Sequence, residues 1–212
     1  TFSFNPTVAG TYQFEITDAN GCPKQSNIIT VDPIVYPVIT GITQTQDIKC
    51  NGDSTGIIAV DVPTTGVGPY TYSIDGGLYQ SSNIFTGLIA GPHSVTVKDS
   101  KGCVNLVPFA FSIAQPNPIN FNLGIVNIQC TGAGNSLGSI TVKNVSGGTG
   151  PFKYFISNNF GSIITPNPYV APSNEDFTFT IIDFGIYTIN VVDANGCNLS
   201  KEITMSSPPG DL

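Results

Sequence analysis

GPHSVTVKDSKGC, at residues 91–103, is the stretch of sequence that decides the fold, because it occurs in three versions along the chain. The other two versions are GTYQFEITDANGC at residues 10–22 and GIYTINVVDANGC at residues 185–197. Apolar and polar residues alternate in each version, which is typical of a half-buried β-strand. The Asp-x-x-Gly-Cys ending predicts a hairpin turn, in which the Asp side chain accepts hydrogen bonds from the backbone and the Gly adopts a positive φ.

A second phrase also repeats and sets the length of the repeat. It reads CNGDSTGIIAVDV from Cys50 and CTGAGNSLGSITVKNV from Cys130. The distance from Cys50 to Cys130 is 80 residues, and the distance from Cys22 to Cys103 is 81 residues. Self-similarity at one fixed period predicts an array of similar structural units.

The last copy of the repeat is longer than the one before it. Cys50 and Cys103 are separated by 53 residues, whereas Cys130 and Cys197 are separated by 67. Most of the surplus falls in one stretch, so we expect an enlarged loop or an extra hairpin at about residues 157–177.

Proline-rich segments mark the boundaries between the repeats. VDPIVYP, AQPNPI and SSPPGDL each follow a hairpin cysteine by about ten residues. Proline ends strands and stiffens linkers. We therefore divide the chain into the last part of a truncated repeat (residues 1–34), a first complete repeat (35–118), a second complete repeat that contains the enlarged loop (119–208) and the start of a further linker (209–212).

Short strand signals dominate each repeat, with turn residues every 8–12 positions. Examples are IIAVDV at residues 57–62 and FTFTIID at residues 177–183. This spacing is typical of an all-β sandwich or barrel, and no window sustains a helical period. The sequence has no run of 18 apolar residues, so we expect no membrane-spanning helix. It has no signal-peptide pattern either, so a secretion signal would lie outside it.

The charge balance argues against two classes of partner. The chain has 14 Asp and Glu residues, 7 Lys residues and no Arg, for a formal net charge of −7. Nucleic-acid binding needs basic patches that neutralise phosphates, so we expect no nucleic-acid partner. Binding to an anionic lipid surface is disfavoured for the same reason.

The five cysteines predict disulfides within repeats. Each complete repeat has one cysteine before its first core strand and one in its hairpin. We therefore expect Cys50 to pair with Cys103 and Cys130 to pair with Cys197, which leaves Cys22 unpaired. A metal site is the alternative, but the sequence has no close Cys-x-x-Cys pair and a single His, which disfavours zinc.

Three phrases follow one another in the first complete repeat, namely CNGDSTGIIAV, GPYTYSIDGG and LIAGPHSVTVKDSKGC. As a set they resemble the SprB repeat of Bacteroidetes cell-surface adhesins. The similarity extends over nearly the whole chain, with insertions in the second complete repeat and a truncated copy at residues 1–34. The G-x-Y-x-x-x-x-x-D segment also resembles PKD-type immunoglobulin-like domains.

The resemblance implies tandem immunoglobulin-like, PKD-like β-sandwich repeats in a very long extracellular protein. Such proteins are exported by the type IX secretion system and displayed as filaments on the bacterial cell surface, where they are associated with gliding motility and attachment. The implied partners are neighbouring repeats of the same chain and other copies in a filament. No catalytic residue is known for the repeat, so we expect no enzyme and no cofactor.

The hairpin aspartates Asp18, Asp99 and Asp193 are candidates for calcium binding, because oxygen-rich turns between domains can hold this ion. Calcium takes six to eight oxygen ligands, however, and each turn offers one carboxylate. A role as acceptor within the hairpin is therefore favoured. Ser54 follows Asp53 in a pattern that resembles the O-glycosylation acceptor of this bacterial group, and we predict a glycan on it.

His93 is the single histidine and takes the position that Tyr12 and Tyr187 hold in the other copies. A tyrosine there would pack its ring and donate its hydroxyl, as in a tyrosine corner, so His93 is interpreted as its structural substitute. No nucleophile motif accompanies the histidine.

Two functions remain open at this stage. The repeats can form a stalk or filament that displays an adhesive tip, or they can bind carbohydrate or another surface ligand directly. The near-equal repeats favour the stalk, and the enlarged loop at residues 157–177 favours direct binding.

Overall fold

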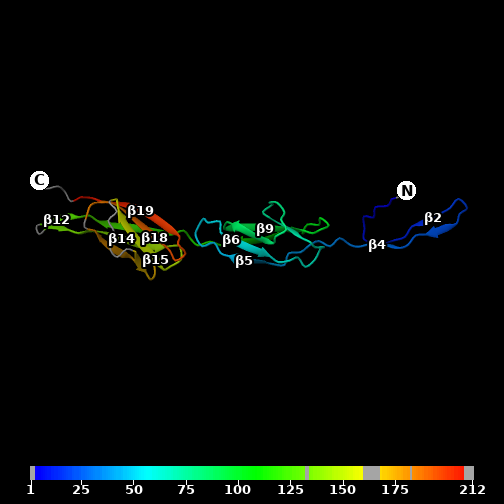
Figure 1. Ribbon diagram of the computed structural model, residues 1–212, viewed down its shortest axis with the longest axis horizontal. Coiled ribbons are helices and arrows are strands. Elements are labelled where there is room, and N and C mark those ends of the chain that lie inside the picture. The colour runs from blue at the N-terminus through cyan, green and yellow to red at the C-terminus, as the bar shows by residue number, and fades with distance from the viewer. Residues whose placement is uncertain (1–2, 132–133, 160–167, 182, 208–212) are drawn as a thin grey trace. The chain divides into compact units, whose positions relative to one another are not determined.

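All regular structure in the described part of the chain is β-strand (Figure 1). The computed structural model describes residues 3–131, 134–159, 168–181 and 183–207. Among these residues, no helix has the length and apolar character needed to span a membrane. The all-β class predicted from the short alternating segments is confirmed.

The N-terminal 34 residues contain two small antiparallel ladders. Strand β1 (Gly10–Tyr12) pairs with β4 (Ile29–Val31), and β2 (Glu15–Thr17) pairs with β3 (Pro23–Gln25). The side chains of β2 and β3 are all exposed. A two-stranded ribbon buries little apolar surface by itself, and none of the described residues 3–34 is buried.

Six strands form two three-stranded sheets in the first complete repeat. One sheet has the order β5-β6-β8 and the other the order β10-β9-β7. Alternate residues of each central strand are buried, as in β9, where His93, Val95 and Val97 point inward. The strands are β5 (Ile42–Gln46), β6 (Gly56–Val60), β7 (Thr71–Ile74), β8 (Ile84–Leu88), β9 (Gly91–Lys98) and β10 (Phe109–Ile113).

The second complete repeat has a three-stranded sheet, β11-β14-β17, and a four-stranded sheet, β16-β15-β18-β19. A further hairpin, β12-β13, precedes β14. Three strands facing four is the arrangement of an immunoglobulin-type sandwich, so this predicted class is confirmed. The strands are β11 (Asn120–Val126), β12 (Gln129–Thr131), β13 (Gly134–Ser136), β14 (Gly138–Ser146), β15 (Phe152–Asn158), β16 (Tyr169–Ala171), β17 (Phe177–Ile181), β18 (Gly185–Val192) and β19 (Asn198–Met205).

Both sheets of this repeat contribute to one apolar core. Ile140 and Phe179 come from the three-stranded sheet, whereas Tyr154 and Ile189 come from the four-stranded sheet, and all four are at most 1% exposed. Burying side chains of this size stabilises the fold by about 1.5–3 kcal/mol each. The inward residues alternate with exposed ones along the strands, as the period-two pattern of the sequence requires.

The enlarged segment of this repeat adds an edge strand. Within the predicted stretch at residues 157–177, β16 pairs antiparallel with β15, so that Phe152 lies opposite Ala171. Residues 160–167 of the stretch lie outside the described part of the structure. Asp176, near its end, accepts a hydrogen bond from the backbone N–H of Asn144 at 2.9 Å. The described end of this stretch is therefore tied to the sandwich.

The chain divides into two compact units. Unit 1 comprises Thr1–Thr43, Ala59–Ile84 and His93–Phe111, and unit 2 comprises Gln44–Ile58, Phe85–Pro92 and Ser112–Leu212. Every sheet draws its strands from within one of the ranges 1–34, 35–118 and 119–208. The repeat boundaries stay a prediction from the sequence.

The pairing of the cysteines differs from the prediction. Cys50 is bonded to Cys197, 147 residues further along the chain and in the same unit, while Cys22 and Cys103 are free thiols. The predicted Cys50–Cys103 bond is therefore wrong. The predicted Cys130–Cys197 bond is wrong as well, because a sulfur atom forms only one disulfide. The side chain of Cys130 lies outside the described structure.

The second complete repeat shows why the cysteines of one repeat do not pair. Cys130 follows β11, whose last residue, Val126, pairs at the start of β14. Gly138, the first residue of β14, lies against Met205, and Met205 in turn pairs with Gly185 at the start of β18. The chain near Cys130 therefore lies at the end of the sandwich where β18 begins.

Cys197 follows the opposite end of the same strand. The eight residues of β18 extend over about 26 Å at about 3.3 Å per residue. The Cα atoms of a disulfide lie within about 7 Å of each other. The two cysteines of one repeat are thus too far apart to bond, although their order in the sequence suggested a bond.

Candidate functional site

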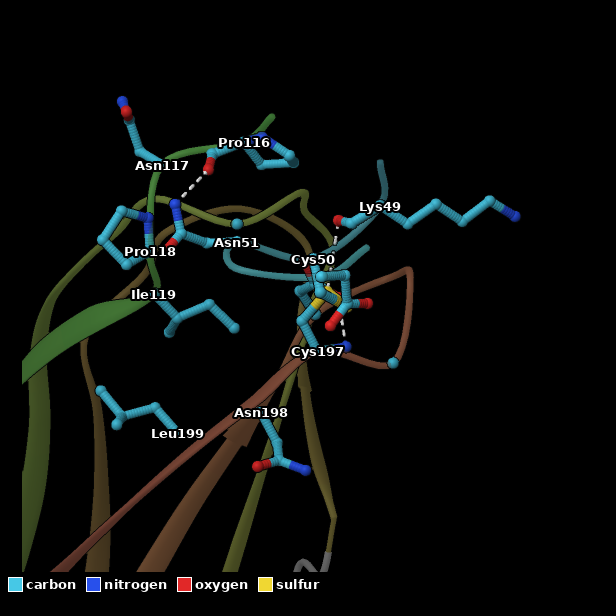
Figure 2. A pocket seen from close by; sticks show the side chains of 14 residues that line it. Lys49, Cys50, Asn51, Pro116, Asn117, Pro118, Ile119, Cys197, Asn198 and Leu199 are labelled. Atoms are coloured by element: carbon cyan, nitrogen blue, oxygen red, sulfur yellow. Dashed lines mark hydrogen bonds between the residues drawn. A yellow bond between two sulfur atoms is a disulfide. The ribbon is translucent and has the colours of Figure 1, made fainter. Parts of the chain in front are cut away.

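A groove of about 380 Å³ surrounds the Cys50–Cys197 disulfide within unit 2, and we call it the staple groove (Figure 2). Four segments of chain meet there: the loop after β5, the proline-rich linker after β10, the loop after β14 and the hairpin after β18. The groove is lined by Lys49, Cys50, Asn51, Asp53, Pro116, Asn117, Pro118, Ile119, Gly148, Asp193, Gly196, Cys197, Asn198 and Leu199.

The loop that carries Cys50 is bonded to the linker. The side-chain amide of Asn51 donates to the carbonyl of Pro116 at 3.0 Å, and the backbone N–H of Gly52 donates to the side-chain oxygen of Gln115 at 2.7 Å (Figure 2 shows the first bond). Gly52 has a φ of +86°, a conformation that glycine adopts without strain. The Asn-Gly pair after Cys50 therefore both turns the loop and attaches it to the linker.

The same loop contacts the hairpin of the second complete repeat. The side-chain amide of Asn195 donates to the carbonyl of Lys49 at 3.4 Å and to the hydroxyl of Thr149 at 3.2 Å. The sulfur of Cys197, which carries no hydrogen in the disulfide, lies 3.3 Å from the same carbonyl. Figure 2 shows the Lys49 side chain extending away from the disulfide. The backbone of Lys49, rather than its charge, makes the contact.

Asp193 holds the hairpin in shape. Its Oδ1 atom accepts hydrogen bonds from the backbone N–H groups of Asn195 at 2.8 Å and Cys197 at 2.9 Å, and its Oδ2 atom accepts one from Thr149 at 2.9 Å. The residue is 4% exposed. A buried carboxylate with three backbone donors fixes the position of the cysteine that follows it.

Asp99 has the same role in the first complete repeat. It accepts from Lys101 at 3.0 Å, Cys103 at 2.8 Å and Val67 at 3.1 Å. Burial opposes ionisation, but the hydrogen bonds from Cys103, Val67 and Lys101 outweigh it and hold the pKa of Asp99 below its usual value. Asp18 accepts the matching pair of bonds from Asn20 and Cys22, both at 2.9 Å.

These contacts give the three calcium candidates a structural explanation. Asp18, Asp99 and Asp193 each accept two backbone hydrogen bonds within their own hairpin, which is the role that the sequence favoured. In the described residues, no three His, Cys, Asp or Glu side chains are grouped as a metal would require. Each turn thus supplies a single carboxylate that is already bonded to the backbone.

His93 lies in the core of β9 and is bonded to a neighbouring turn. Its side chain is 7% exposed, its Nδ1 atom is 2.7 Å from Oδ2 of Asp75, and its ring stacks on Phe111 with ring centroids 5.5 Å apart. Burial raises the pKa of Asp75. The hydrogen bonds from His93 and from the backbone of Ser94 lower it by more, so the net shift of the pKa is downward. Packing and a hydrogen bond make His93 a structural residue.

The tyrosines at the equivalent position form the predicted corner. The hydroxyl of Tyr187 donates to the carbonyl of Asp183 at 2.9 Å, and that of Tyr12 donates to the carbonyl of Val8 at 2.5 Å, each four residues earlier. Burial raises the pKa of the Tyr187 hydroxyl. His93 therefore replaces a residue whose function is to close the corner before its strand.

Ser54 is exposed in the loop between Cys50 and β6, close to the staple groove. This position leaves its hydroxyl accessible to a modifying enzyme. The predicted glycan stays a prediction.

The staple groove has the chemistry of a covalent joint. Its disulfide is surrounded by amide and carbonyl groups that bond to one another, and within the described residues it brings together no nucleophile and base. Sequence reasoning missed three residues whose hydrogen bonds hold the segments around it together, Lys49, Gln115 and Asn195. The sequence singles out the Cys50-Asn51-Gly52 phrase and the prolines, but nothing in it links the loop to a hairpin 147 residues away.

A family model confirms the resemblance of the repeats. The SprB repeat matches residues 42–78 and again residues 123–160. The first match covers β5, β6 and β7, and the second covers most of the chain from β11 to β15. Among curated proteins, none matches the chain.

Several solved structures are similar in fold. They include a C-terminal 282-residue fragment of intimin in complex with the intimin-binding domain of the translocated intimin receptor (17% identity, TM-score 0.37, covering 81% of this chain and 65% of that one). Others are a two-domain fibronectin type III segment of chicken tenascin (14%, 0.35, 80% and 99%) and the Yersinia pseudotuberculosis adhesin InvE (14%, 0.26, 81% and 60%). The chain spans less than two thirds of the intimin fragment and of InvE. With TM-scores below 0.5, these likenesses assign no function.

Proposed function

We propose that this chain, which carries SprB repeats at residues 42–78 and 123–160, is a non-catalytic segment of a bacterial cell-surface adhesin that transmits tensile force through its disulfide. It acts outside the cell as part of a stalk or filament that serves attachment or gliding motility, and its parent protein is exported by the type IX system. Its partners are the neighbouring repeats of the same chain. Disulfides persist in oxidising, extracellular compartments, which supports this location.

The observation that carries the proposal is the Cys50–Cys197 bond. It joins a loop inside the first SprB match, residues 42–78, to the hairpin at the end of the second complete repeat, and it closes a ring of chain that includes the proline-rich linker. A tensile force applied to the two ends of the chain is transmitted from Cys50 to Cys197 through the disulfide. The 146 residues between them carry no load, so they cannot be drawn out while the disulfide is intact.

Pulling single molecules from their two termini tests this role. In the oxidised chain, the sequence between the cysteines cannot extend, whereas in reducing buffer it adds about 50 nm of contour length at about 3.5 Å per residue. The Cys50→Ser variant should give the longer length in both buffers, and the Cys103→Ser variant should behave as the unmodified chain does. Equal contour lengths with and without reductant would contradict force transmission through the disulfide.

Direct binding is the competing function, and the same protein can be used to test it. A glycan array probed with the oxidised chain should give no signal above background if the segment is only a stalk. A sugar bound through the enlarged segment at residues 157–177 would instead favour a ligand-binding repeat.

A further inference from the structure

We infer that Cys103 forms the same kind of bond as Cys197, with the first cysteine of a SprB-type repeat placed directly before the first complete repeat. The disulfide in the structure would then be one member of a series, in which each repeat is bonded to the next. The disulfide partner of Cys103 is thus the cysteine in a Cys-Asn-Gly-type loop of a preceding repeat, equivalent to residues 49–53.

The two hairpin cysteines are held in the same way. The N–H of Cys103 donates to Asp99 at 2.8 Å, and the N–H of Cys197 donates to Asp193 at 2.9 Å. The second oxygen of each Asp accepts from the loop before the strand that pairs with the hairpin's own strand, at Val67 before β7 in one repeat and at Thr149 before β15 in the other. The hairpin around the free thiol of Cys103 therefore has the same hydrogen bonds as the hairpin that positions Cys197 for its bond.

The surface after Cys103 also resembles part of the staple groove. A groove of about 230 Å³ lies between the linker before β5 and the residues that follow the hairpin. Four of its lining residues are large exposed apolar side chains: Tyr36 and Val38 on the linker, and Leu106 and Val107 after the hairpin. The staple groove is likewise built from a linker and the residues after a hairpin, but there the loop at residues 49–53 completes it.

One residue differs between the two hairpins in a way that keeps the contact. Asn195 donates from its side chain to the carbonyl of Lys49. Lys101 holds the equivalent position in the first complete repeat, and its ammonium group can likewise donate a hydrogen bond. It can therefore bond to the matching carbonyl of an incoming loop.

Bond formation is a two-electron oxidation of two thiols. One thiolate attacks a small disulfide such as oxidised glutathione and releases one glutathione thiol. The second thiolate then attacks the mixed disulfide and releases the other glutathione thiol. The two protons and two electrons lost by the cysteines end on the two glutathione molecules.

A series of such bonds gives every linker a covalent bypass. A repeat's first cysteine precedes the linker and the next repeat's hairpin cysteine follows it, as Cys50 and Cys197 flank residues 114–119. Successive disulfide rings overlap, because the first cysteine of each repeat lies before the hairpin cysteine of that repeat. Cutting the chain once in any linker would then leave the array in one piece.

Duplicating the first complete repeat tests the inference. Residues 35–118 are inserted again directly after residue 118, and Leu78, which is 95% exposed, is changed to Ala in the second copy as a mass tag. The chain is oxidised in a glutathione buffer, and its unreduced peptides are identified by mass spectrometry. We expect Cys50 of the first copy bonded to Cys103 of the second copy, and Cys50 of the second copy bonded to Cys197.

The second of these bonds reports that the longer chain has folded. If it forms while Cys103 of the second copy stays a free thiol, or if that thiol bonds to Cys50 of its own copy, the inference is overturned. Changing Cys50→Ser in the first copy alone should free Cys103 of the second copy and leave the bond to Cys197 intact. This result does not depend on the pulling experiment, so the two proposals can fail separately.

The original chain provides a second measurement that does not depend on folding of the longer one. The peptide QDIKCNGDST, residues 46–55, is offered as its mixed disulfide with glutathione. We expect Cys103 to capture it at least tenfold faster than a peptide of the same composition in scrambled order, whereas Cys22, on an isolated hairpin, shows no preference. Equal capture of the two peptides by Cys103 would overturn the inference.

Discussion

The hairpins at residues 91–103 and 185–197 have matching backbone hydrogen bonds but different cysteine chemistry. Each has a buried Asp that binds its own turn and the loop before a core strand. Only Cys197 is bonded to another cysteine, whereas Cys103 is a free thiol. The hairpin therefore forms without its disulfide, and the bond joins repeats instead of closing a single one.

Removing the disulfide should produce the largest difference in stability between variants of the two hairpins. Closing a ring of this size restricts the unfolded chain and stabilises the folded one by about 3–5 kcal/mol in the chain-entropy treatment. We expect Cys50→Ser and Cys197→Ser to lose stabilisation of this order in urea unfolding followed by far-UV circular dichroism. The matched control, Cys103→Ser, should unfold within about 0.5 kcal/mol of the unmodified chain. An equal loss in all three variants would mean that Cys103 is also bonded.

Removing the hairpin aspartates should show how much the two hairpins share. Asp193→Ala leaves three backbone N–H groups without their charged acceptor, which costs about 2–4 kcal/mol. Asp99→Ala should destabilise in the same direction, because its three bonds are equivalent. Asp18→Ala, which removes two exposed bonds, serves as the control and should have the smallest effect.

Thermal unfolding of the oxidised variants measures these differences. Melting temperatures of Asp193→Ala and Asp99→Ala that match that of the unmodified chain would contradict a structural role. A calcium-dependent rise in melting temperature that Asp193→Ala abolishes would instead restore the metal-binding interpretation.

The sequence predicted the local parts of these hairpins and failed on the connection between them. Alternation and the Asp-x-x-Gly-Cys turn are properties of consecutive residues, so the strand, the turn and the acceptor role of Asp193 could all be derived. The equivalence of His93 and Tyr187 followed from aligning the copies. The partner of Cys50 depends instead on which end of a sandwich each cysteine occupies, and near-equal spacings carry no information on that.

The edge strand β16 was beyond sequence reasoning for a related reason. The surplus length of the last repeat located the insertion at about residues 157–177, but whether it forms a loop or pairs with a strand depends on the sheet edge beside it. Only the structure shows that β15 offers that edge to Tyr169–Ala171.

The stability of the first complete repeat should depend more steeply on pH in acid than that of the second. The reason is that the first complete repeat has His93 where the second has a tyrosine. The pKa of Asp75 is lowered by its bonds to His93 and Ser94. A carboxylate with a lowered pKa stabilises the fold at pH values above the ordinary Asp value of about 3.9, and this contribution is lost as pH falls through the lower, folded value. Tyr187 bonds to a backbone carbonyl, so the equivalent position of the second complete repeat lacks this dependence.

The variant His93→Tyr tests whether the bond between His93 and Asp75 causes this pH dependence. It should reduce the slope of stability against pH below about pH 4, because Asp75 loses its partner. Asp75→Asn should have a similar effect, and Tyr187→Phe should leave the slope unchanged. Urea unfolding at a series of pH values measures the three slopes, and parallel curves for His93→Tyr and the unmodified chain would contradict the assignment.

The smallest expected effect comes from changing the prolines of the linker between the two complete repeats. Proline fixes φ and stiffens the chain, so Pro116→Gly with Pro118→Gly should make residues 114–119 more flexible. In the oxidised chain, the Cys50–Cys197 bond and the contacts of Asn51 and Gly52 lie in parallel with this linker and constrain its ends. We therefore expect the distance distribution from small-angle X-ray scattering to broaden only after reduction, with melting temperatures nearly unchanged. Broadening of the same size in the oxidised variant would mean that the prolines, and not the disulfide, set the geometry of the joint.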